Sequence, residues 1–185
     1  MNIFVLHADP VIAAQMQCDR HVVKMILETA QLLSTAHRVL DGVEVRNPKK
    51  SLKLTNDIMD GVLYKATHIN HPSAVWTRDN RANYDWLYGH FIALLDEYTF
   101  RYGRVHASAK LKPFLASYPK NMHTGRPSKI EFSVAMKNEY KVGSTPIEMY
   151  LHYYRATKMG FARWTKRVIP LEFIDYIPVK HFGRV

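Results

Sequence analysis

Five polar residues in the first quarter of the chain have types and spacing that could support catalysis. His21, Lys24, Glu28, Gln31 and Thr35 are spaced i, i+3, i+7, i+10 and i+14, which places them on one line of an α-helix. An imidazole, an ammonium, a carboxylate and an amide on one strip can transfer protons and stabilise charge if the strip faces a cleft. We therefore expect His21, Lys24 and Glu28 to be catalytic and Gln31 to bind substrate.

The helix that must position this strip is predicted over residues 19–40, from Asp19 as its cap to the break at Asp41-Gly42. The rest of its surface is aliphatic, which predicts a largely buried helix: Val22, Val23, Ile26, Ala30 and Leu33 on one broad face, with Met25, Leu27 and Leu32 at its edges. In the alternative interpretation the strip is merely the solvated face, and Lys24 and Glu28 form an ordinary i,i+4 pair. The mixture of His, Gln and Thr favours a site.

Further candidates surround a second long helix, predicted from about residue 74 to 100 with Ser73 as its cap. His71 precedes this helix and is a candidate general acid. The candidate substrate contacts on the helix and its flanks, besides Gln31, are Trp76, Asn83, Arg101, Tyr102 and His106. A buried amide or guanidinium needs specific partners, although packing and the helix dipole are competing explanations for the tryptophan and the arginine. No third ligand accompanies His68 and His71 at a suitable spacing, so we expect no metal.

The excess of positive charge lies entirely in the C-terminal part. Residues 1–100 contain 10 Lys and Arg against 11 Asp and Glu, whereas residues 101–185 contain 16 against 5. The basic residues after Tyr150 alternate with aromatic ones, which suits phosphate contact and base stacking. The candidate nucleic-acid contacts are Arg155, Lys158, Arg163, Trp164, Lys166 and Arg167. In the alternative interpretation the aromatic residues pack inward and the charges are only solvated.

Length and composition predict one globular domain over residues 1–185, with an acid–base site region at 1–106 and a basic aromatic part at 107–185. The chain has 47% apolar residues and one cysteine, Cys18, which excludes a disulfide framework and a cysteine-rich zinc site. No apolar run approaches the ~20 residues of a membrane span. We expect a cytoplasmic protein without a cofactor or a membrane partner. The oligomeric state is left open.

The element pattern predicts a mainly α fold of five to seven helices. Residues 2–6 form a short apolar run, which predicts a strand or a buried extended arm. Asp9-Pro10 predicts the start of a helix, and Thr145-Pro146-Ile147-Glu148 predicts another over 146–158. A short helix is predicted over 55–66, and Ser128–Glu131 has capping-box spacing. No sheet is expected.

Three short motifs resemble known proteins. They are the sequence CDRHVVKMILETAQLL at 18–33, Asn70-His71-Pro72, and EYTFRYG at 97–103. Together they resemble a family of small phage proteins, and their order distantly resembles the pyrimidine-dimer DNA glycosylases of the endonuclease V type. The resemblance covers residues 1–106 and implies a small, basic, mainly helical DNA-repair enzyme of the host cytoplasm.

The resemblance also implies roles for particular residues. Glu28 matches the catalytic glutamate of the glycosylases, whose nucleophile is the α-amine exposed when the initiator methionine is removed. Here Asn2 follows Met1, and so bulky a second residue disfavours that removal. Ile26 and Leu27 stand where that family has a basic residue just before the glutamate. The resemblance therefore supports a glycosidic-bond site more than dimer repair itself.

These observations lead to the hypothesis of an enzyme that cleaves an N-glycosidic bond, with DNA favoured over RNA. Glu28 would stabilise the sugar cation or act as a general base. The nucleophile is water, Lys24 or the Met1 amine, with Lys24 ranked first as a partner of phosphate or carboxylate. His21 and His71 would protonate the leaving base. An extruded base would stack on Trp76, Tyr102 or Trp164.

Two other classes remain open at this point. One is a non-catalytic phage nucleic-acid-binding protein, and the other is a small-molecule enzyme of phage nucleotide or modified-base metabolism. The enzyme hypothesis predicts that His21, Lys24 and Glu28 line one concave, partly accessible pocket. It also predicts that His71 and at least one of Asn83 and Arg101 approach this pocket, and that the basic residues of 101–185 form a continuous surface bordering it.

Overall fold

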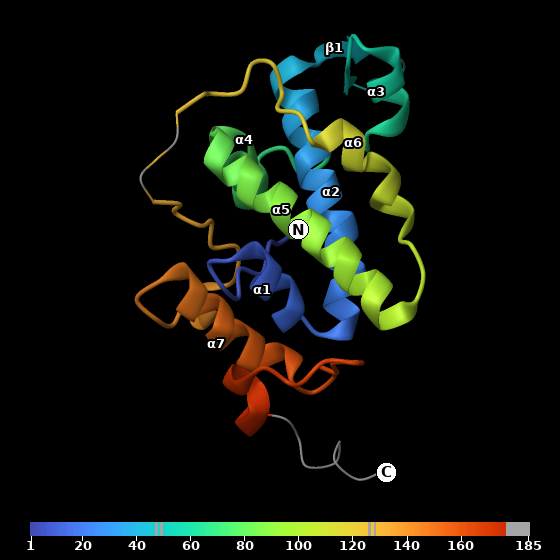
Figure 1. Ribbon diagram of the computed structural model, residues 1–185. Coiled ribbons are helices and arrows are strands. Elements are labelled where there is room, and N and C mark those ends of the chain that lie inside the picture. Colours follow the sequence, from blue (N-terminus) through green and yellow to red (C-terminus); the bar gives the residue numbers. More distant parts are fainter. Residues whose placement is uncertain (47, 49, 126, 128, 177–185) are drawn as a thin grey trace.

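The computed structural model describes residues 1–46, 48, 50–125, 127 and 129–176. Two long helices, α2 (Asp19–Asp41) and α5 (Arg81–Tyr102), cross at the centre of the molecule, as Figure 1 shows. The helix α1 (Pro10–Met16) packs on α5, and α4 (Pro72–Asp79) packs on both long helices. The predicted mainly α fold is confirmed.

The first two helices begin close to where the sequence predicts. Asp9 caps α1, and its side chain accepts hydrogen bonds from the backbone nitrogens of Val11 and Ile12. Asp19 is the first residue of α2 rather than its cap, because Cys18 takes the extended cap conformation. The chain before α1 forms neither a strand nor a helix; its aliphatic residues, including Ile3 and Val5, are buried in the core.

The second long helix is interrupted where the sequence predicts continuity. Asn80 is extended, with φ −156° and ψ 167°, and its side chain accepts a hydrogen bond from the backbone nitrogen of Asn83. An asparagine side chain can replace a helical backbone bond in this way, which ends α4 and begins α5. The cap of α4 is His71 rather than Ser73, with Pro72 at the first helical position.

A two-stranded hairpin follows α2, although no sheet is predicted. Its strands β1 (Val43–Arg46) and β2 (Lys50–Lys53) are antiparallel and mostly exposed. Strands of four residues show too little alternation to be recognised in the sequence. The following helix α3 (Asp57–Val62) is shorter than the predicted 55–66, because Asn56 caps it and Leu63 ends it.

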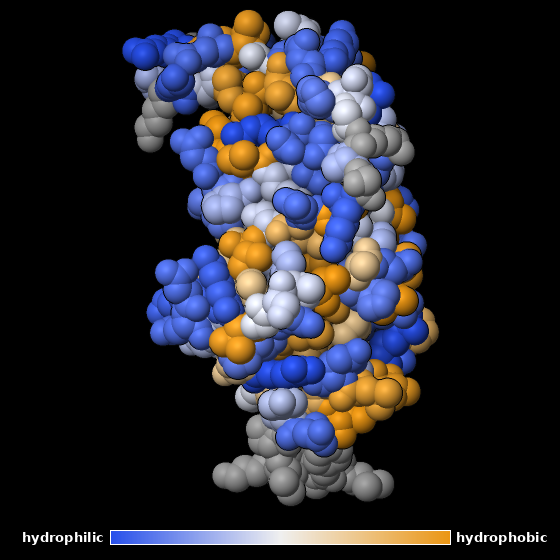
Figure 2. Space-filling view, turned by 90° about the vertical axis from the view of Figure 1, so that its left-hand side faces the viewer, coloured by the Kyte–Doolittle hydropathy of each residue, from blue (hydrophilic) through white to orange (hydrophobic). Residues whose placement is uncertain are grey.

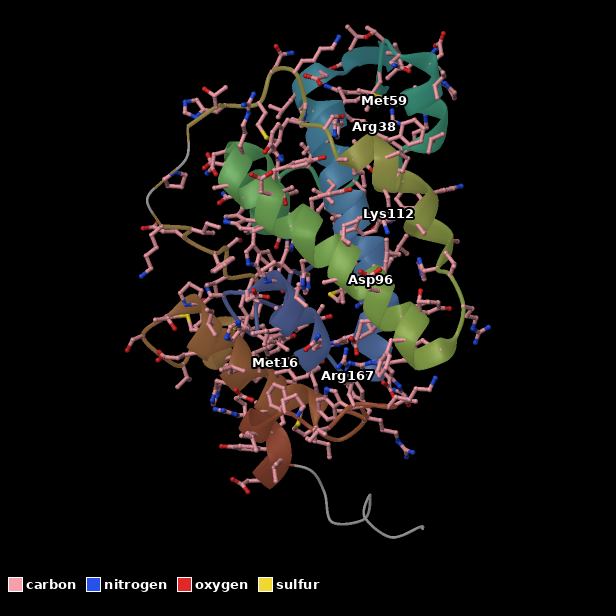
Figure 3. All side chains as sticks on the ribbon, in the orientation of Figure 1. Met16, Arg38, Met59, Asp96, Lys112 and Arg167 are labelled. Atoms are coloured by element: carbon pink, nitrogen blue, oxygen red, sulfur yellow. The ribbon has the colours of Figure 1, made fainter. Side chains whose placement is uncertain are left out.

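One buried arginine joins this end of the molecule to α2. The Arg38 side chain has no exposed surface and donates to the backbone carbonyls of Leu52, Asp60, Leu63 and Tyr64. It also contacts the Asp60 carboxylate, which accepts a hydrogen bond from the backbone nitrogen of Leu54. Arg38 and Met59 lie together at the upper end in Figure 3, far from Arg167 at the lower end. This cluster fixes α3 and the hairpin to α2.

After α5 the chain is irregular until α7 (Pro146–Lys158), with short helices η1 (Ala107–Leu111), α6 (Lys112–Leu115) and η2 (Asn138–Tyr140) before it and η3 (Leu171–Tyr176) after it. Thr145 and Glu148 form the predicted capping box of α7. The capping-box spacing of Ser128–Glu131 begins no helix over 129–136, and Ser128 lies outside the described residues. The connection from α6 to α7 runs along one side of the molecule (Figure 1). We call its residues 129–137 the strap.

Among the described residues, no helix combines the length and the hydropathy that a membrane span requires.

Candidate functional site

The carboxylate of Glu28 lies where α2 meets the start of the chain. Its Oε2 accepts a hydrogen bond of 2.9 Å from the backbone nitrogen of Asn2, and its Oε1 lies 3.3 Å from Nζ of Lys24. The Glu28 side chain is 13% exposed, whereas that of Lys24 is 64% exposed. The spacing predicts this pairing of Lys24 and Glu28, and the structure adds that one face of the carboxylate is held by the backbone.

Asn2 is fixed on several sides, which makes the position of the chain start well defined. Its Oδ1 accepts from the backbone nitrogens of Ile3 and Phe4, and its Nδ2 donates to the carbonyl of Ala135 in the strap. The resulting turn places Phe4 in the left-handed region, at φ 39°. A non-glycine residue persists there only when its surroundings impose it. The turn therefore directs the Asn2 N–H at Glu28.

The strap is held against the chain start by one buried tyrosine on α7. Tyr150 has no exposed surface; its hydroxyl donates to the carbonyl of Ser133 and accepts from the backbone nitrogen of Ala135. Directly before Ser133 the strap carries Phe132, whose ring packs on Trp76 and Trp86. Glu28, Asn2, the strap and α7 thus form one continuous set of contacts.

His71 shares the electrostatic surroundings of Glu28. Burial lowers the pKa of His71, the N-terminal amine and His68 lower it further, and Glu28 acts in the opposite direction. Its Nδ1 accepts a hydrogen bond from the backbone nitrogen of Ser73, which leaves the proton of the neutral ring on Nε2. Burial thus favours the neutral form of His71, which carries a hydrogen-bond donor at Nε2, and Glu28 is close enough to act on its pKa.

His21 lies nearby but is enclosed by aromatic rings. It is 6% exposed, its ring centroid lies 4.5 Å from that of Phe4, and it packs edge-on against Tyr154 and Phe161. Burial lowers its pKa to about 3, and the positive charges of Lys158 and Lys24 add to this effect. His21 is thus neutral near pH 7, and this argues against its expected role as a general acid.

The predicted polar strip of α2 is only partly a surface strip. His21 and Thr35 are buried, the latter with its hydroxyl against the backbone of Thr67. Gln31 is half-buried, one turn beyond Glu28. In addition, two aliphatic residues expected on the buried part of the helix, Val23 and Leu27, are 40% and 41% exposed. The chain start and α7 cover one edge of the strip, which displaces the exposed face towards Val23 and Leu27.

The residues at the end of α5 are occupied elsewhere. The buried guanidinium of Arg101 contacts the carboxylates of Glu97 and Asp19, at 2.7 and 2.9 Å, and the carbonyl of Gln15. Asp19 and Glu28 point to opposite sides of α2, since nine residues correspond to two and a half turns. Arg101 therefore does not approach Glu28, which contradicts the expectation from the sequence.

The neighbours of Arg101 also have structural contacts. The Tyr102 hydroxyl donates to the carbonyl of Asp19, and Nδ1 of His106 accepts from the backbone nitrogen of Ser108, which caps η1. Burial lowers the pKa of His106 and raises that of Tyr102. Neither side chain is brought to Glu28 by these contacts.

Two candidates on α4 and α5 are buried. Trp76 is 7% exposed and donates from Nε1 to the carbonyl of Glu131 in the strap. Asn83 is 3% exposed; its Nδ2 donates to the carbonyl of Trp76, while its buried Oδ1 has no hydrogen-bond partner in the described residues. These contacts position α4 and the strap, and neither side chain is free to stack on or bind a ligand at the surface.

Three of the expected nucleic-acid contacts have intramolecular roles. Trp164 is 7% exposed and donates to the carbonyl of Met16. Arg167 forms a two-bond ion pair with Glu97, with its Nη2 2.8 Å from Oε2. Arg155 donates to the carbonyl of Glu172 and so holds η3. These contacts attach residues 164–172 to α7, α1 and α5.

The other three reach the surface to different degrees. Lys166 is exposed, and its Nζ donates to the carbonyl of Phe100. Arg163 is also exposed. Lys158 is half-buried, with its Nζ 4.8 Å from the ring centroid of Tyr153 and 5.7 Å from that of Phe4. The positive charges of Lys158 and Lys24 both lower the pKa of His21, so Lys158 lies within electrostatic reach of the same part of α2.

Asn2, Tyr150 and the strap are the parts of this site that sequence reasoning missed. Asparagine near a chain start often forms a turn with its own backbone, which is the one local signal for Asn2. The pairing of Ala135 with Asn2 and Tyr150 spans 133 and 15 residues, and no local pattern reports such contacts.

The described cavities do not coincide with Glu28. One of about 660 Å³ lies between the strap and the start of α7, lined among others by Lys129, Phe132 and Thr145. Another of about 480 Å³ lies between α1 and α5, beside Glu97 and Arg167. Figure 2 shows hydrophobic and hydrophilic residues interleaved over the side of the molecule that it displays. In the described part of the chain, no three His, Cys, Asp or Glu side chains gather as metal ligands.

Comparisons of the chain with family models, with curated proteins and with solved structures give no significant match.

Proposed function

We propose that this protein is an enzyme that cleaves the N-glycosidic bond of a nucleotide in DNA, with Glu28 as the catalytic carboxylate. The observation that supports the proposal best is the position of Glu28. It is a largely buried carboxylate next to the first residues of the chain, with an ammonium group 3.3 Å away. Departure of a base leaves a positively charged sugar, which a fixed carboxylate in a water-poor environment stabilises strongly.

The Met1 amine is the nucleophile that this arrangement favours. It directly precedes the amide that binds Glu28, and its charge acts on His71. Lys24 is less suitable, because its side chain is 64% exposed and its Nζ pairs with Oε1 of Glu28. Lys24 is better placed to bind a phosphate.

In the covalent route, the amine attacks C1′ of the sugar and the base leaves with the bonding electron pair. The base takes up one proton and the amine loses one; opening of the sugar ring then transfers the second proton of the nitrogen to the ring oxygen and leaves an imine. The Nε2–H of neutral His71 is suited to hydrogen-bond the leaving base or the sugar oxygen rather than to act as a strong acid. If water is the nucleophile instead, Glu28 acts as its general base and no imine forms.

The test is incubation with duplex and single-stranded oligonucleotides that contain normal, modified or damaged bases, with borohydride present to reduce an imine. Glu28→Gln keeps the shape of the side chain and removes its charge, so we expect a loss of about 100-fold or more in base release. Asp96→Asn, which changes an exposed carboxylate on α5 (labelled in Figure 3), is the matched control and should retain activity. Mass analysis of the trapped adduct distinguishes Met1 from Lys24.

The two alternative classes give different results in the same experiment. A non-catalytic nucleic-acid-binding protein would bind the oligonucleotides and release no base from any of them. A small-molecule enzyme would show little salt-dependent affinity for DNA. If Glu28→Gln lowers the melting temperature and the loss of folded protein accounts for the whole loss of activity, the carboxylate only stabilises the fold.

A further inference from the structure

Two exposed aliphatic residues adjoin the proposed catalytic carboxylate. Val23 and Leu27 are 40% and 41% exposed, one turn apart on α2, and Leu27 directly precedes Glu28. The other large aliphatic residues of this helix up to Leu33 are fully buried: Val22, Met25, Ile26, Leu32 and Leu33. Packing of the core thus explains why those five positions are apolar. It does not explain why the exposed positions 23 and 27 are apolar too.

Cationic groups surround this pair. Lys24 lies between Val23 and Leu27 in the sequence, and its side chain is 64% exposed. Arg20 is exposed one turn earlier, with its guanidinium carbon 5.1 Å from the ring centroid of Phe161. In the described part of the chain, no carboxylate lies within ion-pair distance of Arg20. A small apolar patch between cations complements a polyanion with an apolar interior better than it complements a neutral protein surface.

The location of Glu28 imposes a requirement on a duplex substrate. The carboxylate is 13% exposed and is covered by the chain start on one side. A nucleotide that remains stacked in a duplex cannot bring its glycosidic bond to such a group, so it must be extruded. Proteins that unstack a base step insert aliphatic side chains between the bases and hold the adjoining phosphates with cations.

We propose that Val23 and Leu27 form an apolar wedge that enters the base stack of duplex DNA beside the nucleotide taken by Glu28, while Arg20 and Lys24 contact the adjoining phosphates. This inference rests on the proposed function, since it assigns the strand state of the substrate at the same site. It makes duplex DNA the substrate class and gives the exposed face of α2 the task of opening it.

The experiment measures base unstacking without catalysis. All variants carry Glu28→Gln, and the probe is a short duplex with 2-aminopurine next to a tetrahydrofuran abasic analogue. Binding of the Glu28→Gln protein should raise the 2-aminopurine fluorescence, because unstacking relieves its quenching. Adding Val23→Ala and Leu27→Ala should reduce that rise by about fivefold while affinity falls by less than about threefold, since phosphate contacts supply most of the affinity.

Ile58→Ala is the matched control, because Ile58 is 69% exposed on α3 and distant from α2's first turns in the fold. An unchanged fluorescence rise in the double alanine variant would overturn the wedge. So would binding without any rise, binding restricted to single strands, or a protein dimer that the alanine substitutions dissociate. Absence of binding to every oligonucleotide would overturn the wedge and the proposed function together. If the wild-type protein releases a base but the fluorescence rise does not depend on Val23 and Leu27, the wedge is overturned and the proposed function stands.

Discussion

Glu28 Oε2 lies 2.9 Å from the backbone nitrogen of Asn2, although 26 positions separate the two residues. This contact joins the first long helix to the start of the chain. Because the partner of the carboxylate is a backbone group, substitution of the Asn2 side chain does not remove the hydrogen bond directly. It acts instead through the turn that Asn2 makes and through the strap.

The first prediction concerns Tyr150→Phe. The substitution removes the hydroxyl that accepts from Ala135 and donates to Ser133. A partly buried N–H left without a partner costs about 1–3 kcal/mol, so the strap should detach more readily. Amide hydrogen exchange at Ala135 should become at least about tenfold faster, in keeping with that cost. Tyr153→Phe is the control, and equal exchange rates in both variants would contradict this role of Tyr150.

The second prediction is a loss of stability in mild acid. Burial is the main cause that lowers the pKa of His21 to about 3 and those of His37 and His90 to about 4. The unfolded chain takes up protons on these residues at about pH 6.5, and the folded protein resists that uptake. Each of these histidines therefore lowers the free energy of unfolding by about 1.4 kcal/mol per pH unit as the pH falls from 6.5 towards 4. Urea unfolding at pH 7, 6 and 5 measures the slope.

His37→Gln tests the origin of that slope. The glutamine does not titrate. Between pH 6.5 and 4, the slope of the unfolding free energy against pH should therefore be smaller in the variant than in the wild type by the contribution of about one proton. Asp41 and a backbone hydrogen bond near Ser117 raise the pKa of His37 slightly against the effect of burial. A slope identical to that of the wild type would show that His37 titrates normally in the folded protein.

The third prediction concerns Asp60→Asn. Burial acts to raise the pKa of Asp60, but the Leu54 N–H and the Arg38 guanidinium lower it to about 2. The stabilisation is thus present above about pH 4 and is lost as the pH falls towards 2. At neutral pH, Asp60→Asn should cost about 3–5 kcal/mol, because Arg38 loses its counter-charge inside the protein. Asp57→Asn, at a side chain that is 90% exposed, should cost little.

The pH dependence separates this ion pair from mere packing. The difference in unfolding free energy between the wild type and Asp60→Asn should shrink between pH 4 and pH 2, where the aspartate gains its proton. A difference that stays constant over this range would mean that the charge of Asp60 contributes nothing.

The fourth prediction distinguishes the basic residues of the C-terminal region. If Lys158 and Arg163 contact phosphates, replacing both with Gln should make the log–log dependence of duplex affinity on salt shallower by about 1.8, at roughly 0.9 per contact. Arg167→Gln should leave the salt dependence unchanged and lower stability by about 2 kcal/mol, because its guanidinium is bonded to Glu97. A shallower salt dependence for Arg167→Gln would contradict this division.

Local signals allow part of the fold to be predicted from the sequence. Asp9-Pro10 and the Thr145–Glu148 box begin helices where expected, since a cap involves only neighbouring residues. The break at Asn80 escapes prediction, because asparagine is tolerated within helices and acts as a cap only where its own backbone is extended. The hairpin escapes because its strands are short and exposed.

The candidate site was predictable only as far as one helix determines it. The i,i+4 spacing predicts the contact of Lys24 with Glu28. Which side of α2 is solvated depends on what covers it, and the cover of His21 comes from Phe4 and α7. Similarly, the positive charge of Arg101 and Arg167 is visible in the sequence, while their pairing with Glu97 and Asp19 depends on packing across up to 82 positions.

The attachment of the strap by Tyr150 also has a consequence for protein synthesis. Translation delivers the chain from its first residue onwards, and domains begin to fold as they emerge. Asn2 and Glu28 emerge early, but the strap that holds Asn2 is itself held by α7, near the end of the described chain. A nascent or prematurely terminated chain that lacks α7 therefore cannot complete the surroundings of Glu28. Any activity of this carboxylate should appear only after α7 has left the ribosome.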